Sequence, residues 1–213
     1  MPSFFLFENT QKNLYRKKRT ITMWGRDFRI RKFCFSHSCL YRTKSMTCDF
    51  KSSIDWHDDF PSPGVRFCDL NPLLFDIQKR ERILAELVLA AGSHNPEIIV
   101  GVDARGFIWA SLLADKMGLP LVLARKKGKL GGPIDVFRTV NEYATELFAI
   151  QKKYNFEGKN VLIVDDIYAT GGTMRGIHDH ILSKGANSCY GLVVFDVAIS
   201  EREPYVTTVM SNP

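Results

Sequence analysis

The chain has 213 residues, of which 45% are hydrophobic and 24% charged, an ordinary composition for one domain with a substantial core. No apolar run approaches the roughly 18 residues that a membrane span needs, so we expect a soluble protein that does not engage a membrane. The net charge of +6 lies in residues 1–50, which hold 11 Lys and Arg against 3 acids, whereas the remainder holds 18 against 20. The composition of that nearly neutral remainder therefore gives no case for nucleic-acid binding.

Residues 1–45 form a basic leader that is rich in Ser and Thr and poor in acids. This composition is typical of a mitochondrial presequence. It equally fits a mis-assigned start, because Met46 opens directly onto the well-patterned region, or a basic arm for RNA or anionic lipid. We expect the leader to be disordered and the folded domain to occupy residues 46–213.

The five cysteines contain no C-x-x-C pair. Their number and spacing indicate neither a zinc site nor a disulfide framework. A reducing compartment follows as the default, which is the cytoplasm unless the leader is a real mitochondrial presequence.

After residue 51 the predicted elements alternate between helices and strands. Helices are expected over ERILAELVLAAG (81–92), over FIWASLLADKMG (107–118), and from about Gly172 to Lys184 with Met174, Ile177, Ile181 and Leu182 on one face. Short apolar runs predict strands at 97–102, 120–125, 160–164 and 190–198. Strands that are apolar throughout and alternate with helices predict an α/β fold, an open twisted parallel sheet with helices on both faces.

Between Lys126 and Asn160 this pattern loosens. The segment GKLGGP (128–133) is too rich in glycine for a core element. Glycine-rich surface segments beside a regular scaffold are often mobile, so we expect a flexible hood or flap here.

The stretch VLIVDDIYATGGTM (161–174) begins as a buried strand and continues through two acids into a glycine-rich loop. In an open parallel sheet, ligands bind beyond the carboxyl ends of the strands, where Asp165 and Asp166 are expected. The ATGGT segment (169–173) offers unhindered glycine amides, threonine hydroxyls and the unpaired N–H groups of a helix N-terminus. The stretch therefore predicts an anion site with carboxylates beside it.

The two acids narrow the choice of anion. A polyphosphate along the loop would meet both carboxylates, and no Lys follows the glycines as a Walker site requires. No G-x-G-x-x-G follows a strand, which argues against a dinucleotide. A ligand with one terminal phosphate and a nearby diol suits both halves, because carboxylates accept hydrogen bonds from vicinal hydroxyls and can help hold Mg²⁺ through its waters. The stretch thus predicts a ribose 5-phosphate site.

The same stretch resembles the 5-phosphoribosyl 1-pyrophosphate (PRPP) signature of the type I phosphoribosyltransferases, and its ATGGT form is similar to that of the adenine phosphoribosyltransferases. Four more blocks resemble that family in the same order: FPSPGVRFCDLNPL (60–73), GVDARGF (101–107), RKKGKLGGP (125–133) and NEY (141–143). The resemblance covers about residues 47–198. It implies a Mg²⁺-dependent homodimeric enzyme of purine salvage that converts adenine and PRPP to AMP and pyrophosphate.

The resemblance also implies the site residues. PRPP and AMP would be bound by Asp165, Asp166, Ala169, Thr170, Gly171, Gly172 and Thr173, with Mg²⁺ held by the two acids through water. Pyrophosphate would be bound by Ala104, Arg105, Arg125, Lys126 and Lys129, where Arg105 is also catalytic and Arg125 reaches the partner subunit's site. Adenine would lie against Arg66, Phe67, Cys68 and Ile167, with main-chain groups of Arg66 and Cys68 at its edge.

The flap carries the remaining implied roles. Glu142 would be the catalytic carboxyl, a general acid or base for a ring proton of adenine, a role that contributes about 10²–10⁴-fold in rate. Tyr143 would pack over the closed site. The Asp103–Ala104 peptide matches a position that the family often holds in the non-proline cis form. His178 and His180 share no helix face, and we expect them to be structural.

Several positions depart from the family pattern. Cys68 stands where Arg is usual, Tyr168 where Leu is common, an acid usually present near Ala149 is missing, and TTVMSNP (207–213) suggests no closing strand. Two alternatives therefore stay open: a divergent purine phosphoribosyltransferase of other base specificity, and a non-catalytic sensor of PRPP or nucleotide. The ATGGT block, and the lack of a Lys suited to a 6-oxo group, argue against the first. Glu142, Lys126 and Lys129 argue against the second, because a sensor needs no hood acid or pyrophosphate cations.

Overall fold

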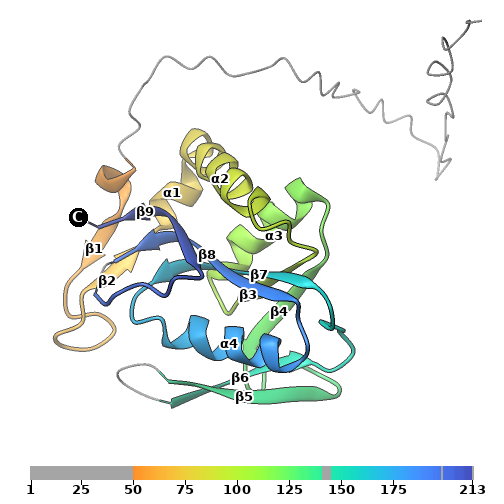
Figure 1. Ribbon diagram of the computed structural model, residues 1–213. Coiled ribbons are helices and arrows are strands. Elements are labelled where there is room, and N and C mark those ends of the chain that lie inside the picture. Colours follow the sequence, from red (N-terminus) through yellow and green to blue (C-terminus); the bar gives the residue numbers. More distant parts are fainter. Residues whose placement is uncertain (1–49, 141–144, 198, 213) are drawn as a thin grey trace, which may run out of the picture. The chain divides into compact units, whose positions relative to one another are not determined.

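A computed structural model describes residues 50–140, 145–197 and 199–212 (Figure 1). The predicted leader and the flap residues Glu142 and Tyr143 lie outside the described residues. The helical elements are η1 (Lys51–Ser53), α1 (Asn71–Phe75), α2 (Ile77–Gly92), α3 (Gly106–Met117) and α4 (Gly172–Ser183). The strands are β1 (Asp55–His57), β2 (Phe67–Asp69), β3 (Ile98–Val102), β4 (Leu121–Lys126), β5 (Ile134–Val140), β6 (Thr145–Gln151), β7 (Asn160–Tyr168), β8 (Ser188–Asp196) and β9 (Val206–Ser211).

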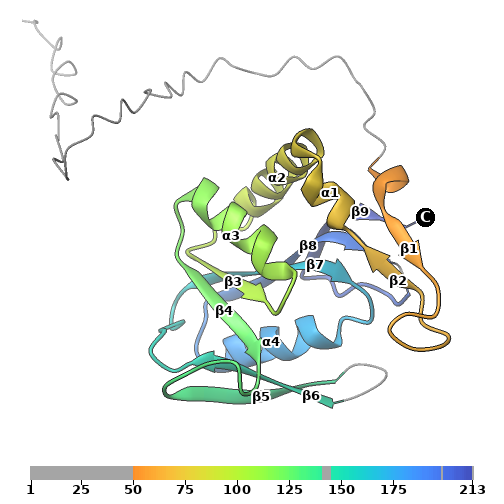
Figure 2. The same ribbon diagram turned by 180° about the vertical axis from the view of Figure 1, so that it is seen from behind.

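The described residues form a seven-stranded sheet in the order β5-β6-β4-β3-β7-β8-β9. The strands from β4 to β9 in that order run parallel, whereas β6 pairs antiparallel with both β4 and β5. Helices α2 and α3 cover one face of the parallel part, and α4 covers the other (Figures 1 and 2). The predicted α/β class is confirmed, and an antiparallel hairpin extends its parallel sheet.

The central strand β7 shows why these strands are apolar along their length. Leu162 and Val164 pack in the core under α2 and α3, while Val161 and Ile163 pack in the core under α4. Successive side chains of a strand point to opposite faces, so a sheet covered on both sides needs apolar residues at every position.

The predicted helices are present, with corrected details. Helix α2 begins at Ile77, earlier than its apolar stripe suggested, because the carboxylate of Asp76 caps it by accepting from the amides of Gln78 and Lys79. Helix α3 ends as expected at Gly118, which has a φ of 68°. Of the four residues expected on one face of α4, Met174, Ile177 and Ile181 are buried, whereas Leu182 is 40% exposed.

Three strand predictions also need correction. The loosely patterned segment after Lys126, for which no strand was predicted, contains the antiparallel hairpin of β5 and β6. The C-terminal residues form β9 parallel to β8, so the expected lack of a closing strand was wrong. Strand β7 continues to Tyr168 because β8 pairs with it as far as Asp196, although its pairing with β3 ends at Val164.

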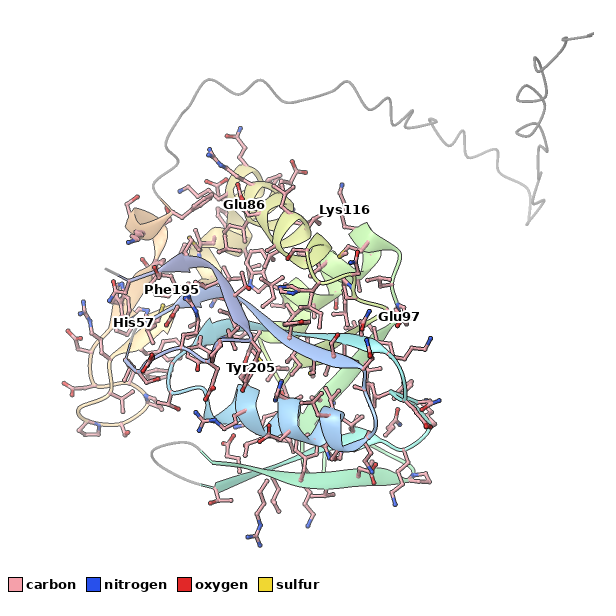
Figure 3. The ribbon with its side chains drawn as sticks, viewed as in Figure 1. His57, Glu86, Glu97, Lys116, Phe195 and Tyr205 are labelled. Atoms are coloured by element: carbon pink, nitrogen blue, oxygen red, sulfur yellow. The ribbon has the colours of Figure 1, made fainter. Side chains whose placement is uncertain are left out.

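The small sheet of β1 and β2 packs beside the carboxyl end of β8. Trp56 contacts Phe195 edge to face at 6.2 Å between ring centroids, and Figure 3 shows His57 of β1 on the same side as Phe195. The Asp103–Ala104 peptide is cis, as predicted. In the part of the chain that the structure describes, no helix has the length and apolar character to span a membrane.

Candidate active site

A cavity of about 330 Å³ opens at the carboxyl edge of the parallel strands. It lies where the pairing of β7 with β3 ends at Val164, so Asp165 and Asp166 follow the last residue of β7 that pairs with the neighbouring strand. The predicted site residues that line it are Ala104, Arg105, Lys126, Asp165, Asp166, Ile167 and Thr173. The wall is completed by residues that were not predicted for the site: Val102, Asp103, Glu146 and Phe148.

The two acids hold their carboxyl groups in different environments. The backbone amide of Asp166 donates to Oδ1 of Asp165 at 2.8 Å, which fixes that side chain. Burial, and then the negative charge of Asp166, raise the pKa of the Asp165 carboxyl well above its usual range. Asp166 is 6% exposed, and its Oδ2 accepts no well-aligned hydrogen bond from any described residue. A buried carboxylate oxygen with acceptor capacity left is suited to a ligand hydroxyl.

The side chain of Arg105 connects Asp166 to strand β2. Its Nε lies 2.7 Å from Oδ2 of Asp166, its Nη1 donates to the carbonyl of Cys68 at 3.1 Å, and its guanidinium lies 4.9 Å from the ring centroid of Phe67. The side chain is 36% exposed, so part of the cation faces the cavity. Arg105 thereby connects the predicted base-binding block to the predicted sugar-binding acids.

The start of α3 lies directly against β7 and needs Gly106. A Cβ atom at this position would come within 2.6 Å of Oδ1 of Asp165 and 3.0 Å of the carbonyl oxygen of Val164. Gly106 therefore permits the loop carrying Arg105 to approach the acids closely.

Two cations of the hood block, Arg125 and Lys126, are paired with carboxylates. Arg125 donates from Nε to Oδ2 of Asp103 at 3.2 Å and from Nη1 to the carbonyl of Lys129 at 3.0 Å. Lys126 reaches across to β6, where its Nζ lies 2.7 Å from Oε1 of Glu146. Glu146 had no signal in the sequence, because its approach to Lys126 depends on the pairing of β4 with β6.

The glycine-rich loop turns from β7 into α4. Gly171 has a φ of 77°, and a Cβ there would overlap the phenol of Tyr168 beneath it. The loop therefore needs glycine for both backbone conformation and space. Thr173, in the first turn of α4, lines the cavity beside the acids.

Of the four predicted adenine-binding residues, only Ile167 lines the cavity. Arg66 lies over the ring of Trp56 at 4.7 Å and forms an ion pair with Asp58 at 3.4 Å. The Cys68 side chain is buried, and desolvation by burial raises its pKa to about 12, so its thiol is suited to packing rather than nucleophilic chemistry.

The two helix α4 histidines lie away from the cavity. His178 stacks on Tyr205 at 3.8 Å between ring centroids, and His180 stacks on Phe137 at 4.1 Å. Both rings act in packing, which agrees with the structural role expected for them.

Comparison with known proteins places this arrangement in a family. The family model described as "Phosphoribosyl transferase domain" matches residues 74–212. The chain is 39% identical over 145 residues to the adenine phosphoribosyltransferase of Synechococcus sp., covering 68% of this chain and 82% of that protein. It is 36% identical over 155 residues to the adenine phosphoribosyltransferase of Prochlorococcus marinus, covering 72% and 90%.

Solved structures of adenine phosphoribosyltransferases are also similar to this chain. Adenine phosphoribosyltransferase from Thermoanaerobacter pseudethanolicus superposes with a TM-score of 0.72 at 28% identity, covering 76% of this chain and 98% of that one. The Saccharomyces cerevisiae enzyme, complexed with an imino-altritol bisphosphate and adenine, gives 0.67 at 30% identity, covering 75% and 95%. The PRPP-like stretch, the cavity built around its acids and these matches together show that the chain is a phosphoribosyltransferase-domain enzyme of the type I fold.

Proposed function

We propose that this enzyme transfers the 5-phosphoribosyl group of PRPP to adenine, producing AMP and pyrophosphate in purine salvage. The observation that carries the proposal is the cavity in which Asp165 and Asp166 meet Thr173, at the end of the glycine-rich loop, and the cations Arg105 and Lys126. The choice of adenine is supported by the relatives, which bear the name adenine phosphoribosyltransferase.

The sugar would bind at the acids and its phosphate at the loop. Ribose hydroxyls can donate to both carboxylates, including the Oδ2 of Asp166 that accepts no aligned hydrogen bond from the described residues. The 5-phosphate would accept from the amides and threonine hydroxyls of residues 169–173, at the positive end of α4. This orientation leaves the anomeric carbon and its pyrophosphate toward Arg105.

Departure of pyrophosphate builds negative charge that the nearby cations can stabilise. Arg105 and Lys126 line the cavity, but Asp166 and Glu146 hold them. The pyrophosphate must therefore compete with protein carboxylates for both cations. Arg125 and Lys129 lie at the adjacent hood base, where Arg125 donates to the Lys129 carbonyl.

In the chemical step, the bond between the anomeric carbon and the pyrophosphate oxygen breaks, and the electron pair leaves with pyrophosphate. N9 of adenine forms the new bond and loses its proton. We assign that proton to Glu142, which the sequence places on the flap between β5 and β6. Turning Arg105 toward pyrophosphate would also release the carbonyl of Cys68, which could then face the edge of the base.

A magnesium ion fits this site as a partner of the substrate. Among the described residues no three His, Cys, Asp or Glu side chains gather as a metal cage. Mg²⁺ commonly binds through one or two carboxylates, waters and substrate phosphates, which Asp165 and Asp166 could support. When bound, the ion would neutralise part of the charge on the pyrophosphate.

We further propose a homodimer, in which Arg125 approaches the partner's site, and a cytoplasmic location. The location is supported by Cys68 and Cys189, which are buried free thiols that a reducing compartment would preserve. Analytical ultracentrifugation would test the dimer, because a monomer at assay concentration would contradict it.

A base-competition assay tests the proposed reaction. Purified protein with Mg²⁺ and PRPP should convert adenine to AMP and leave guanine and hypoxanthine unchanged. Conversion of another purine would establish a different base specificity. PRPP binding without any nucleotide product would contradict an enzyme and favour a sensor.

A further inference from the structure

The glycine-rich loop is held, on the side away from the cavity, by contacts with a segment about thirty residues later in the chain. Residues 199–205, which connect β8 to β9, lie against the loop at 169–173 and against α4. Figure 3 shows Tyr205 from this connection above α4, where its ring stacks on His178. None of residues 199–205 lines the cavity, so their contacts act through the loop rather than on a ligand.

Tyr168 lies between the glycine-rich loop and residues 199–205 and contacts both. Its side chain is 2% exposed, and its hydroxyl oxygen accepts a hydrogen bond from the amide of Glu203 at 3.2 Å. The phenol lies so close under Gly171 that a Cβ at Gly171 would overlap it. The loop therefore rests on the Tyr168 ring, and the ring is held in turn by the β8–β9 connection.

A second set of contacts joins the β8–β9 connection to α4 and to the glycine-rich loop. The Glu203 carboxylate pairs with the guanidinium of Arg175, whose Nε donates to it at 2.8 Å. The backbone amide of Arg175 donates to the carbonyl of Gly171 at 2.8 Å. The connection also reaches the start of the loop directly, because Oγ of Ser200 donates to the carbonyl of Ala169 at 3.1 Å.

We infer that Tyr168, Glu203 and Arg175 are positioning residues for the phosphate of PRPP. The amides of the loop can bind a phosphate well only if they are held in one orientation before it arrives, since ordering them at binding costs affinity. Tyr168 supports Gly171 from below, and Glu203 fixes both Tyr168 and Arg175. The inference rests on the proposed function, because it assigns the loop to the phosphate.

The test uses substitutions that remove single contacts. Tyr168→Phe keeps the ring under Gly171 but removes the acceptor for the Glu203 amide, and Glu203→Gln removes the charge that holds Arg175. Each should raise KM for PRPP about three- to ten-fold, the effect of one hydrogen bond, with kcat and KM for adenine within about two-fold of wild type. The matched control is Glu97→Gln, which removes the 2.9 Å ion pair to Lys159 at the opposite end of β7 and should leave KM for PRPP unchanged.

A binding measurement separates this inference from the proposed reaction. Calorimetric titration with ribose 5-phosphate should show the same three- to ten-fold loss of affinity in Tyr168→Phe and Glu203→Gln, whether or not wild type forms AMP. Wild-type binding without AMP would refute the reaction and leave the positioning role intact. Variants that melt at a lower temperature but bind ribose 5-phosphate like wild type would overturn the inference, because the contacts would then stabilise the fold alone.

Discussion

Arg105 and Asp166 form the contact that joins the two halves of the site, with 2.7 Å between Nε and Oδ2. The guanidinium comes from the loop before α3 and the carboxylate from β7, and the same guanidinium donates to the carbonyl of Cys68 near the predicted base-binding wall. Arg105 thus pairs with Asp166 in the structure. The proposed reaction requires this ion pair to be exchanged for one between Arg105 and the departing pyrophosphate.

Substitution of Arg105 should be costly for catalysis. Arg105→Gln removes the cation beside the developing pyrophosphate charge, and loss of such a group lowers kcat by about 10²–10³-fold. Steady-state kinetics with adenine and PRPP would measure it. Arg80→Gln is the control, since Arg80 is also half-buried but donates to the carbonyl of Leu74 outside the cavity. Equal losses in the two variants would show that the effect of Arg105 is not specific to the site.

Glu146 should weaken pyrophosphate binding by holding Lys126. Glu146→Gln removes the carboxylate 2.7 Å from the ammonium and leaves the cation available to the anion. We expect the inhibition constant of pyrophosphate to fall about three- to ten-fold, the range for one ordinary hydrogen bond, because solvent screens this half-exposed ion pair. Product-inhibition kinetics would measure the change. An unchanged or higher constant would contradict competition between Glu146 and pyrophosphate.

Asp165 should cost stability at neutral pH. Its folded pKa lies well above the unfolded value of 3.8, mainly through burial, so the folded state keeps the proton to higher pH. Stability from this group is therefore present below the unfolded pKa and is lost as pH rises through the folded pKa. Asp165→Asn can still accept from the Asp166 amide but carries no charge, so its melting temperature should exceed that of wild type by an amount that grows as the pH rises above the unfolded pKa of 3.8.

The control for this prediction is Asp115→Asn on the exposed surface of α3. Asp165→Asn should also lose affinity for PRPP, because an amide accepts fewer hydrogen bonds from the ribose hydroxyls than a carboxylate. A variant that is less stable than wild type at every pH would mean that the charged carboxylate is satisfied within the fold.

Substitution of Glu142 should lower kcat without changing the affinity for PRPP. Glu142→Gln keeps the size of the side chain and removes its ability to exchange a proton, so kcat should fall by about 10²-fold or more. The dissociation constant of PRPP, measured by calorimetry, should remain within about two-fold of wild type. An equal loss of turnover and PRPP affinity would assign Glu142 to binding.

The central fold could be predicted because burial leaves a regular pattern in the sequence. The apolar run of β3 and the stop at Gly118 are local signals, and both are found in the structure. The hairpin of β5 and β6 was missed because its strands mix apolar and polar residues and follow a glycine-rich segment. Strand β9 was missed because it is a short edge strand defined by pairing with β8.

The site residues also differ in whether the sequence could predict them. Asp165, Asp166 and Thr173 line the cavity, and they could be predicted because they lie in one short stretch of chain. Glu146 and Glu203 could not, because each meets its partner only when distant strands or connections come together. Tyr168 was visible in the sequence as a departure from the family pattern, but its support of Gly171 is a property of the fold.

The most direct measurement is a crystal structure of the enzyme with Mg²⁺ and PRPP. Density should show the 5-phosphate on the amides of residues 169–173 and the two ribose hydroxyls within hydrogen-bond distance of the Asp165 and Asp166 carboxylates. If the sugar phosphate instead binds elsewhere, or the protein's own side chains occupy that corner at saturating ligand, the central claim is contradicted.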